Sequence, residues 1–289
     1  MSLKSLLASD KPVLSFELFP PKSDAGVDDL MGNVADLASL KPDFFTCTYG
    51  AGGSTRDRTL EITSRVRTET DLPVASHLTC VGSTRDELRG YLTRAQEKGV
   101  DYIVALRGDP PKGETEFKPV DGGLSYANEL VELIKAEFPS FGILVAGYPE
   151  THQEAPDAAV DIENLVRKVD AGADAIVTQL FYDNDDFFSF RDRCVAAGIE
   201  VPIIPGLLPV LSLKQVQRIA SLCKAALPKA FVDRLSEKDD ADWQFKVGVE
   251  HATEQSRGLV EAGVPGIHYY VLNRATATRH ILSEVSGLT

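Results

Sequence analysis

The segment Ser15-Phe16-Glu17-Leu18-Phe19 holds one ionisable residue among mostly apolar neighbours. A charged carboxylate inside an apolar strand is costly unless it is paired, and burial without a partner favours the protonated form. A carboxyl group that stays protonated near neutral pH can act as a general acid. Glu17 is therefore a candidate acid, and the residue types leave a structural ion-pair partner open as the alternative.

Two charged residues, Arg107 and Asp109, flank Gly108 directly after the apolar run 102–106, and two prolines stiffen the chain behind them. Opposite charges on either side of a glycine, at the end of an apolar run, are hard to explain by packing alone. We interpret them as ligand-binding residues at the tip of a strand.

A glycine-rich segment, Thr48-Tyr49-Gly50-Ala51-Gly52-Gly53-Ser54-Thr55-Arg56, follows another apolar run. Its three glycines let a ligand approach the backbone closely, and Arg56 opens a helical pattern, as in a phosphate cradle at a helix N-terminus. The segment matches neither the P-loop nor the G-x-G-x-x-G fingerprint, so by itself it is a weak indication of an anionic ligand.

Other polar residues stand in or after apolar runs. His77 by itself is more typical of a satisfied core histidine than of a ligand. Tyr148 and His152 follow the run 142–147 and could flank a planar ligand. Gln179 ends a later run in the same way. These residues add hydrogen-bonding groups to the strand tips but do not define a reaction.

One predicted helix carries Asp161, Asn164 and Lys168 at the spacing i, i+3, i+7, which places them on one face. Polar residues on one helical face normally meet solvent. The residue types alone therefore predict a solvated face rather than a ligand site.

Several common kinds of catalytic site have no counterpart in the sequence. It has no His, Cys and Asp cluster at metal-ligand spacing, no G-x-S-x-G and no lysine at a strand end. The four cysteines form no C-x-x-C pair, which predicts free, mostly buried thiols in a reducing compartment: Cys47, Cys80, Cys194 and Cys223. The residues favour a metal-free enzyme with one acid and an extended organic ligand.

Eight short apolar runs must position these residues. They are rich in Val, Ile, Phe and Tyr and alternate little, as strands covered on both faces do. Amphipathic patterns between them, as over 27–40, 87–98 and 162–171, predict helices. Repeated βα units predict a parallel sheet, and eight units favour an α/β fold with a single (β/α)₈ TIM barrel over an open doubly wound sheet. The predicted strands are 13–19, 44–48, 74–79, 102–106, 142–147, 175–180, 203–207 and 266–271.

Glycines mark four predicted joints between a helix and the next strand, where a left-handed C-cap is needed: Gly99, Gly172, Gly198 and Gly263. The segment 225–241 breaks this rhythm, because it contains Pro228 and a charge run. We expect it to be a surface excursion before a long final helix over 243–262.

Length and composition agree with one barrel. The chain has 289 residues, and a barrel needs about 250. Hydrophobic residues make up 43% and charged residues 25%, enough for a large core. The net charge of −13 disfavours nucleic acid and membrane surfaces as partners. The sequence has no signal-peptide pattern and no membrane span. We expect one catalytic domain over 1–289 in the cytoplasm.

Seven ordered motifs together resemble the methylenetetrahydrofolate reductase family. They span 13–274 and read Ser-Phe-Glu-Leu-Phe-Pro-Pro, Thr-Tyr-Gly-Ala-Gly-Gly-Ser-Thr-Arg, His-Leu-Thr-Cys, Ala-Leu-Arg-Gly-Asp, Gly-Tyr-Pro-Glu, Asp-Ala-Gly-Ala-Asp…Thr-Gln and Tyr-Tyr-Val-Leu-Asn-Arg. No regulatory domain follows the barrel, so the resemblance is to the short bacterial form.

The resemblance implies a (β/α)₈ flavoenzyme. In the family, NADH or NADPH reduces bound FAD, and the hydride then passes to 5,10-methylenetetrahydrofolate to give 5-methyltetrahydrofolate. This reaction belongs to one-carbon metabolism and methionine biosynthesis. The resemblance also implies a cytoplasmic homo-oligomer, either dimer or tetramer, with ping-pong kinetics.

The family's site residues carry over to positions of this sequence that match its motifs. The resemblance makes Glu17 the catalytic acid and Asp109 a second catalytic residue near the flavin. It implies folate or nicotinamide contacts from Glu17, Thr48, Asp109, Gln179, Gln215, Ile219 and Arg274. It implies no metal. It implies FAD contacts from Thr48, Tyr49, Ala51, His77, Arg107, Gly108, Asp109, Tyr126, Tyr148, His152, Ala155, Asp161, Asn164, Arg167 and Lys168.

One position departs from the family pattern. The bacterial type member has a Phe one turn after the position of Gln215, and this sequence has Ile219 there, so an aromatic contact to folate and nicotinamide is lost. Three alternatives stay open beside the family reading. They are another FAD-dependent barrel oxidoreductase of the proline dehydrogenase kind, a barrel lyase with a phosphate ligand at the 50–56 loop, and a binding module without activity.

Overall fold

The computed structural model describes residues 2–21, 23–49, 56–110, 113 and 116–288. The strands of this described chain form one parallel sheet in the order β7-β6-β5-β4-β3-β2-β1-β9-β8, with helices between them, so the predicted α/β barrel is confirmed. The strands are β1 (Val13–Leu18), β2 (Phe44–Cys47), β3 (Val74–Thr79), β4 (Tyr102–Leu106), β5 (Gly142–Gly147), β6 (Ala175–Thr178), β7 (Ile203–Ile204), β8 (Gly206–Leu207) and β9 (Gly266–Tyr269).

The predicted strand 203–207 is in fact two short strands, which corrects the expectation of eight strands. β7 pairs with β6, β8 pairs with β9, and Pro205 lies between them. Proline has no N–H to give to the ladder, so the strand is interrupted there. The Pro205 carbonyl still accepts from His268 N at 2.9 Å, and Gly206 N donates to Thr178 Oγ1 at 2.9 Å. β7 and β8 together therefore close the ring between β6 and β9.

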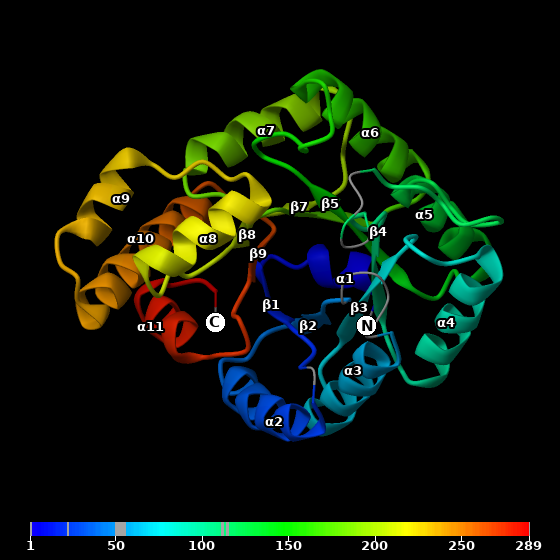
Figure 1. Cartoon of the computed structure of the whole chain (residues 1–289), viewed down its shortest axis with the longest axis horizontal. Coiled ribbons are helices and arrows are strands. Elements are labelled where there is room, and N and C mark those ends of the chain that lie inside the picture. Colours follow the sequence, from blue (N-terminus) through cyan, green and yellow to red (C-terminus); the bar gives the residue numbers. More distant parts are fainter. Residues whose placement is uncertain (1, 22, 50–55, 111–112, 114–115, 289) are drawn as a thin grey trace.

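Helices surround the strands as a ring (Figure 1). They are α1 (Leu3–Leu7), α2 (Asp24–Ala38), α3 (Arg56–Thr70), α4 (Arg85–Glu97), α5 (Ala127–Glu137), α6 (Ala158–Asp170), α7 (Asn184–Ala196), α8 (Leu213–Cys223), α9 (Lys229–Ser236), α10 (Ala241–Glu261) and α11 (Thr276–Glu284). The four glycines predicted as helix C-caps all have positive φ, from +71° to +115°.

Two expectations about the last third of the chain are wrong. The segment 225–241 is not only a surface excursion, because it contains α9. This helix buries Phe231 and Leu235 in a hydrophobic cluster with residues of α8 and α10. The long helix α10 begins at Ala241 and is not the last one, since α11 follows β9.

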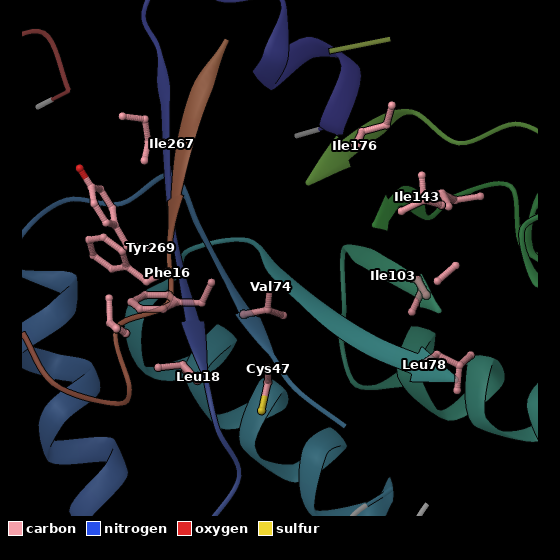
Figure 2. Packing of buried hydrophobic residues seen from close by; sticks show 14 of the residues in the cluster. Phe16, Leu18, Cys47, Val74, Leu78, Ile103, Ile143, Ile176, Ile267 and Tyr269 are labelled. Carbon is pink, nitrogen blue, oxygen red and sulfur yellow. The ribbon is translucent and has the colours of Figure 1, made fainter. Parts of the chain in front are cut away.

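Side chains alternate between the outer and inner faces of the strands. Outward residues such as Phe16, Leu78 and Ile103 pack with the surrounding helices in the main hydrophobic cluster (Figure 2). Inward residues near the strand starts, Val13 and Phe44 among them, pack with the buried leucines of α1, which lies inside the ring in Figure 1. The short helix α1 thus fills the amino end of the barrel, and the polar inner residues remain for the carboxyl end.

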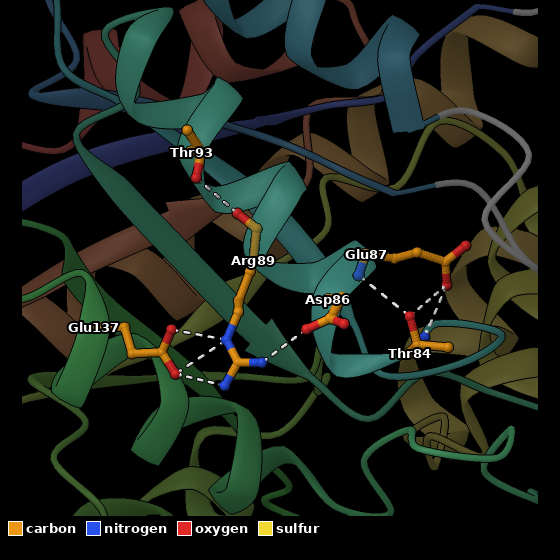
Figure 3. A network of polar contacts seen from close by, with 6 residues as sticks. All are labelled: Thr84, Asp86, Glu87, Arg89, Thr93 and Glu137. Atoms are coloured by element: carbon orange, nitrogen blue, oxygen red, sulfur yellow. Dashed lines mark hydrogen bonds and ion pairs between the residues drawn. The ribbon is translucent and has the colours of Figure 1, made fainter.

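The helices flanking β4 are fixed by surface contacts (Figure 3). Thr84 Oγ1 accepts from Glu87 N at 3.2 Å, and the Glu87 carboxylate accepts from Thr84 N at 2.8 Å, which is a capping box at the start of α4. Arg89 of α4 donates to Glu137 at the end of α5, with Nη2–Oε1 at 2.8 Å. Neighbouring helices of the ring are thereby tied to each other as well as to the sheet.

Two further expectations concern cysteines and membranes. The four cysteines are free, as predicted, with Cys47, Cys80 and Cys194 buried and Cys223 half-buried. Among the helices of the described residues, none has the length and apolar character needed to cross a membrane.

Candidate active site

The inner face of the barrel turns polar at its carboxyl end, around Glu17. The Glu17 side chain is buried, and its Oε2 lies 3.3 Å from His77 Nε2 and 3.6 Å from His268 Nε2. His268 Nδ1 lies 2.8 Å from Ser15 Oγ, which fixes the ring of that histidine. The carboxyl group of Glu17 therefore lies within an apolar strand and also has histidine partners. Its sequence context left two roles open, a general acid and an ion-pair partner, and its position is compatible with both.

Burial in this cluster favours the neutral form of His77. Burial lowers the pKa of His77, and Glu17 opposes that shift. Burial also raises the pKa of Tyr270 well above its ordinary value, and Glu17 adds to this increase. A neutral imidazole can share a proton with a neighbouring carboxyl group, so Glu17 and His77 together form a site that can hold and release one proton.

A cavity of about 890 Å³ opens beside the tips of β4 and β5. Its walls come from those strand ends, from the start of α5 and from one face of α6. This volume is in the upper part of the range for small-molecule and cofactor sites. The lining includes Asp161, Asn164 and Lys168, so the α6 face that residue types alone assign to solvent borders the cavity.

Lys168 is a buried cation at the wall of this cavity. Its Nζ donates to the Ala146 carbonyl at 2.6 Å, and no carboxylate is paired with it by a direct contact among the described residues. Burial lowers the pKa of Lys168 to about 8, and the nearby Asp161 opposes this shift. An anionic ligand in the cavity would supply the missing counter-charge.

Arg107, in contrast, already has an anionic partner at the cavity wall. Its Nη1 and Nη2 donate to the two Glu154 carboxylate oxygens at 2.6 and 2.7 Å, and its guanidinium lies 5.1 Å from the centre of the Phe117 ring. Glu154 raises the pKa of Arg107, as expected for a bidentate pair.

The turn after β5 is held in shape by the cavity residues themselves. His152 N donates to Asp161 Oδ2 at 3.0 Å, and His152 Nδ1 accepts from Glu154 N at 3.1 Å. The His152 ring also packs edge-on against Tyr148, with ring centres 4.6 Å apart. The Tyr148 and His152 rings, held nearly at a right angle to each other, thus form part of the cavity wall.

The residues predicted to contact FAD fall into three groups. Thr48 and Tyr49 follow β2, His77 lies in β3, and Gly108 and Asp109 follow β4, near the mouth of the barrel. Ala51, with the rest of 50–55, lies outside the described residues. The remaining predicted contacts line the cavity: Arg107, Tyr126, Tyr148, His152, Ala155, Asp161, Asn164, Arg167 and Lys168.

Two of the strand-tip residues have constrained positions. Gly108 has φ +90°, and a Cβ there would lie 2.8 Å from a Val81 methyl, so only glycine fits next to Asp109. The Tyr49 ring packs edge-on against Tyr91 of α4, with centres 6.0 Å apart, and so points into the helix layer. A ligand would meet the Tyr49 backbone more readily than its ring.

Beyond Glu17, Thr48 and Asp109, the residues predicted to contact folate or nicotinamide lie after β6, on α8 and after β9. Gln179 follows β6, and its Oε1 accepts from Leu180 N at 2.9 Å. Gln215 lies in the first turn of α8, where its Oε1 accepts from Leu211 N at 3.0 Å. Ile219 is one turn further along the same face of α8. Arg274 is exposed after β9 and lines a smaller cavity of about 170 Å³.

The position of Cys223 shows which way this face of α8 is turned. Cys223 is one turn beyond Ile219, and burial raises the pKa of its thiol. Asp109 and Glu17 add to that increase, so both carboxyl groups lie within electrostatic reach of the thiol. Ile219 and Cys223 also pack against a cluster that includes Leu180 after β6 and Leu208 after β8, so this face of α8 is directed toward the strand tips.

Sequence reasoning missed His268 and Glu154. The signal for His268 was available, because Ser15 and Glu17 are two residues apart on β1, and His268 and Tyr270 are two residues apart at β9, so both pairs share the inner face. No pattern in the sequence pointed to Glu154, which pairs with a residue 47 positions away. Within the described ranges, no group of three or more His, Cys, Asp or Glu side chains could hold a metal ion.

Comparison with known proteins gives the same fold and a family. A sequence profile of methylenetetrahydrofolate reductase matches residues 2–286. The 5,10-methylenetetrahydrofolate reductase of Escherichia coli K12 is 44% identical over 280 residues, covering 95% of this chain and 92% of the relative. An Arabidopsis thaliana protein named methylenetetrahydrofolate reductase (NADH) 1 is 39% identical over 94% of this chain and 48% of its own length.

A solved structure shows the same fold at much lower sequence identity. It is an uncharacterized protein from Clostridium thermocellum described as binding two copies of 5-methyl-5,6,7,8-tetrahydrofolic acid. It superposes with a TM-score of 0.66 at 14% identity, covering 98% of this chain and 97% of that one.

Proposed function

The chain belongs to the methylenetetrahydrofolate reductase family, a family of oxidoreductases, and from that premise we propose that it uses bound FAD to carry hydride from NADH to 5,10-methylenetetrahydrofolate. NADH is the donor named for the Arabidopsis relative. We further propose that donor and folate use the site in turn, which gives ping-pong kinetics. The product is 5-methyltetrahydrofolate.

The cavity beside β4 and β5 is our candidate for the FAD site. Its volume of about 890 Å³ suits a large cofactor, and the Tyr148 and His152 rings contribute aromatic surface to its wall. Lys168 and Arg167 would hold the diphosphate or nearby oxygens, with Arg107 beside them. FAD, when bound, supplies a group that accepts and then donates a hydride.

Glu17 is our candidate for the acid of the folate half-reaction. The five-membered ring of methylenetetrahydrofolate must open to an iminium before it can accept hydride, and opening requires a proton on the leaving nitrogen. Glu17, with the neutral His77 beside it, would hold that proton inside the barrel and deliver it to the nitrogen. The NADH half-reaction needs no such acid.

Asp109 would serve the cofactor end of the site. It follows Gly108 at the tip of β4, where its carboxylate also contributes to the raised pKa of Tyr148. A negative charge near the flavin's N1–C2 end disfavours the anionic reduced form and improves hydride donation. Asp109 could also accept hydrogen bonds from the pterin ring.

The observation that carries the proposal is the pairing of two unlike features at one end of the barrel. One is the paired, buried carboxyl group of Glu17, and the other is a large cavity lined by the buried cation Lys168. An acid and a site for an anionic cofactor, both at the carboxyl end of the strands, are what the proposed two-step reaction requires.

A visible spectrum tests the proposal directly. We expect purified protein to absorb at about 450 nm, to bleach with NADH without oxygen, and to recover its colour with methylenetetrahydrofolate. Flavin released by heat should gain fluorescence on phosphodiesterase treatment if it is FAD. A colourless protein that fails to bind added FAD would contradict the proposal. Bleaching without recovery by the folate would favour another FAD-dependent barrel oxidoreductase of the proline dehydrogenase kind.

A further inference from the structure

The tips of β1 and β9 are joined by the side chain of Asn273. Phe19 N donates to Asn273 Oδ1 at 2.8 Å, and Asn273 Nδ2 donates to the Phe19 carbonyl at 2.9 Å. The two residues are 254 positions apart in the sequence. One side-chain amide therefore makes, at this point, the pair of bonds that a neighbouring strand would otherwise make.

This bridge begins where the backbone ladder stops. The register between β1 and β9 runs from Val13↔Gly266 to Phe16↔Tyr269. Glu17 is the next residue on β1 after that last pair, and Phe19 follows two positions later. The Asn273 amide thus fixes the part of β1 that leaves the ladder, and this part carries the proposed acid.

The residue type at 273 suits this task. Asn273 has φ +60° and follows Leu272 with φ +49°, so the chain turns through the left-handed region that asparagine tolerates better than most residues. An amide side chain also has both an acceptor and a donor, whereas a carboxylate only accepts. The left-handed turn aims the amide at Phe19, and Arg274 comes directly after it.

We propose that Asn273 is a positioning residue that sets the distance between Glu17 on β1 and Arg274 after β9. This inference rests on the proposed function, in which Glu17 protonates the folate, and on the folate contact predicted for Arg274. The Asn273 amide, through its two bonds to Phe19, holds Glu17 and Arg274 in place relative to each other, although these residues belong to opposite ends of the chain. The NADH half-reaction does not depend on this distance.

The test uses stopped-flow absorbance of the FAD-loaded protein to follow the two half-reactions separately. Asn273→Gly removes the amide and keeps a residue that adopts positive φ freely. We expect the limiting rate of flavin reoxidation by methylenetetrahydrofolate to fall about 10- to 100-fold, because displacing a reacting group by about 1 Å costs that much. Flavin reduction by NADH should stay at the wild-type rate.

Two further variants separate positioning from general damage. Lys41→Gly is the matched control, since Lys41 also has φ +57° but is exposed before β2, at the opposite end of the barrel. It should leave both half-reactions unchanged. Asn273→Asp keeps the acceptor for Phe19 N and loses the donor, so its reoxidation rate should lie between wild type and Asn273→Gly.

The outcomes are distinguishable. If Asn273→Gly reoxidises like Lys41→Gly, or slows both half-reactions equally, the positioning role is wrong and the proposed function is untouched. If the wild-type protein itself is reduced by NADH but not reoxidised by the folate, the proposed function fails and this inference fails with it.

Discussion

At the scale of single residues, Glu17 separates the two halves of the proposed reaction. Glu17→Gln keeps the shape of the side chain and its hydrogen-bonding capacity next to His77, but it has no proton to give. We expect the variant to bind FAD and to be reduced by NADH within about tenfold of wild type, since that step needs no acid. Reoxidation by methylenetetrahydrofolate should slow by about 10²–10⁴.

Stopped-flow absorbance measures each half-reaction of the Glu17→Gln variant, with Glu97→Gln on the exposed side of α4 as the control substitution. Equal slowing of both halves would mean that Glu17 organises the flavin site instead of supplying a proton. Normal reoxidation would remove Glu17 from the reaction and leave Asp109 as the next candidate acid.

Lys168 predicts how cofactor binding depends on pH. Burial lowers the pKa of Lys168 to about 8, so the free protein carries this cation below pH 8 and loses it as the pH rises. An anionic diphosphate binds the cationic form better. The affinity of the apoprotein for FAD should therefore be constant at lower pH and fall as the pH rises through about 8. A charge-assisted contact of this kind contributes about 1.5–3 kcal/mol.

Fluorescence titration of apoprotein with FAD between pH 6 and about 9.5 checks this, because the window brackets the pKa given above. Lys168→Met should bind FAD weakly at every pH and without the fall, whereas Lys98→Met, on an exposed residue after α4, should behave like wild type. A wild-type affinity that does not change across this range would show that Lys168 takes no part in holding the cofactor.

At the scale of elements, α8 decides what Ile219 contributes. Its face with Ile219 and Cys223 is directed toward the strand tips, so a side chain at 219 is well placed to meet a ligand there. Ile219→Phe would provide an aromatic ring for stacking, worth about 0.5–1.5 kcal/mol beyond its burial. We expect the KM for NADH or for the folate to fall by up to about tenfold.

Steady-state kinetics with each substrate varied in turn would measure this effect. Leu222→Phe is the control, because Leu222 is on α8 but 68% exposed, away from the strand tips. If Ile219→Phe changes neither KM, the side chain at 219 does not reach the ligands.

The strands were predictable because a buried parallel sheet leaves a simple pattern. Runs such as 102–106 and 142–147 are apolar on both faces and end in polar residues, and the structure has strands with these bounds. The break at Pro205 was not recognised, since both halves of 203–207 are apolar and pair with different neighbours. α9 was missed because its buried residues, Phe231 and Leu235, stand within a polar, charge-rich stretch.

The candidate site was predictable to a different degree. The polar residues at the strand tips could be predicted from the sequence, because each of them directly follows its own apolar run. Contacts between the first and last strands, such as Glu17 with His268 or Phe19 with Asn273, join residues more than 250 positions apart. They depend on which strands are neighbours and on where the register starts. The α6 face shows the same limit. Its polar residues suggest a solvated face when the helix is considered alone, and only the folded structure places them opposite the tips of β4 and β5.

At the scale of the whole molecule, the barrel depends on the seam where β6, β8 and β9 meet. Gly206 lies there, and a Cβ at this position would be 2.3 Å from the Thr178 carbonyl oxygen and 2.8 Å from the Tyr270 ring. The Gly206 N–H is bound to Thr178 Oγ1, and the Tyr270 hydroxyl donates to the Thr178 carbonyl at 2.7 Å. Backbone and ring therefore approach each other as closely as a glycine permits.

Gly206→Ala should lower the free energy of unfolding by about 1–3 kcal/mol, because the extra methyl forces apart a backbone carbonyl and a ring that are both held by hydrogen bonds. Gly32→Ala is the matched control, since Gly32 is within α2 and a Cβ there meets nothing within 4 Å. That change should raise stability by up to about 1 kcal/mol. Urea unfolding followed by circular dichroism and tryptophan fluorescence measures both. Equal stability of the two variants would mean that the seam can open to admit a methyl group and that the ring of strands is not tightly closed there.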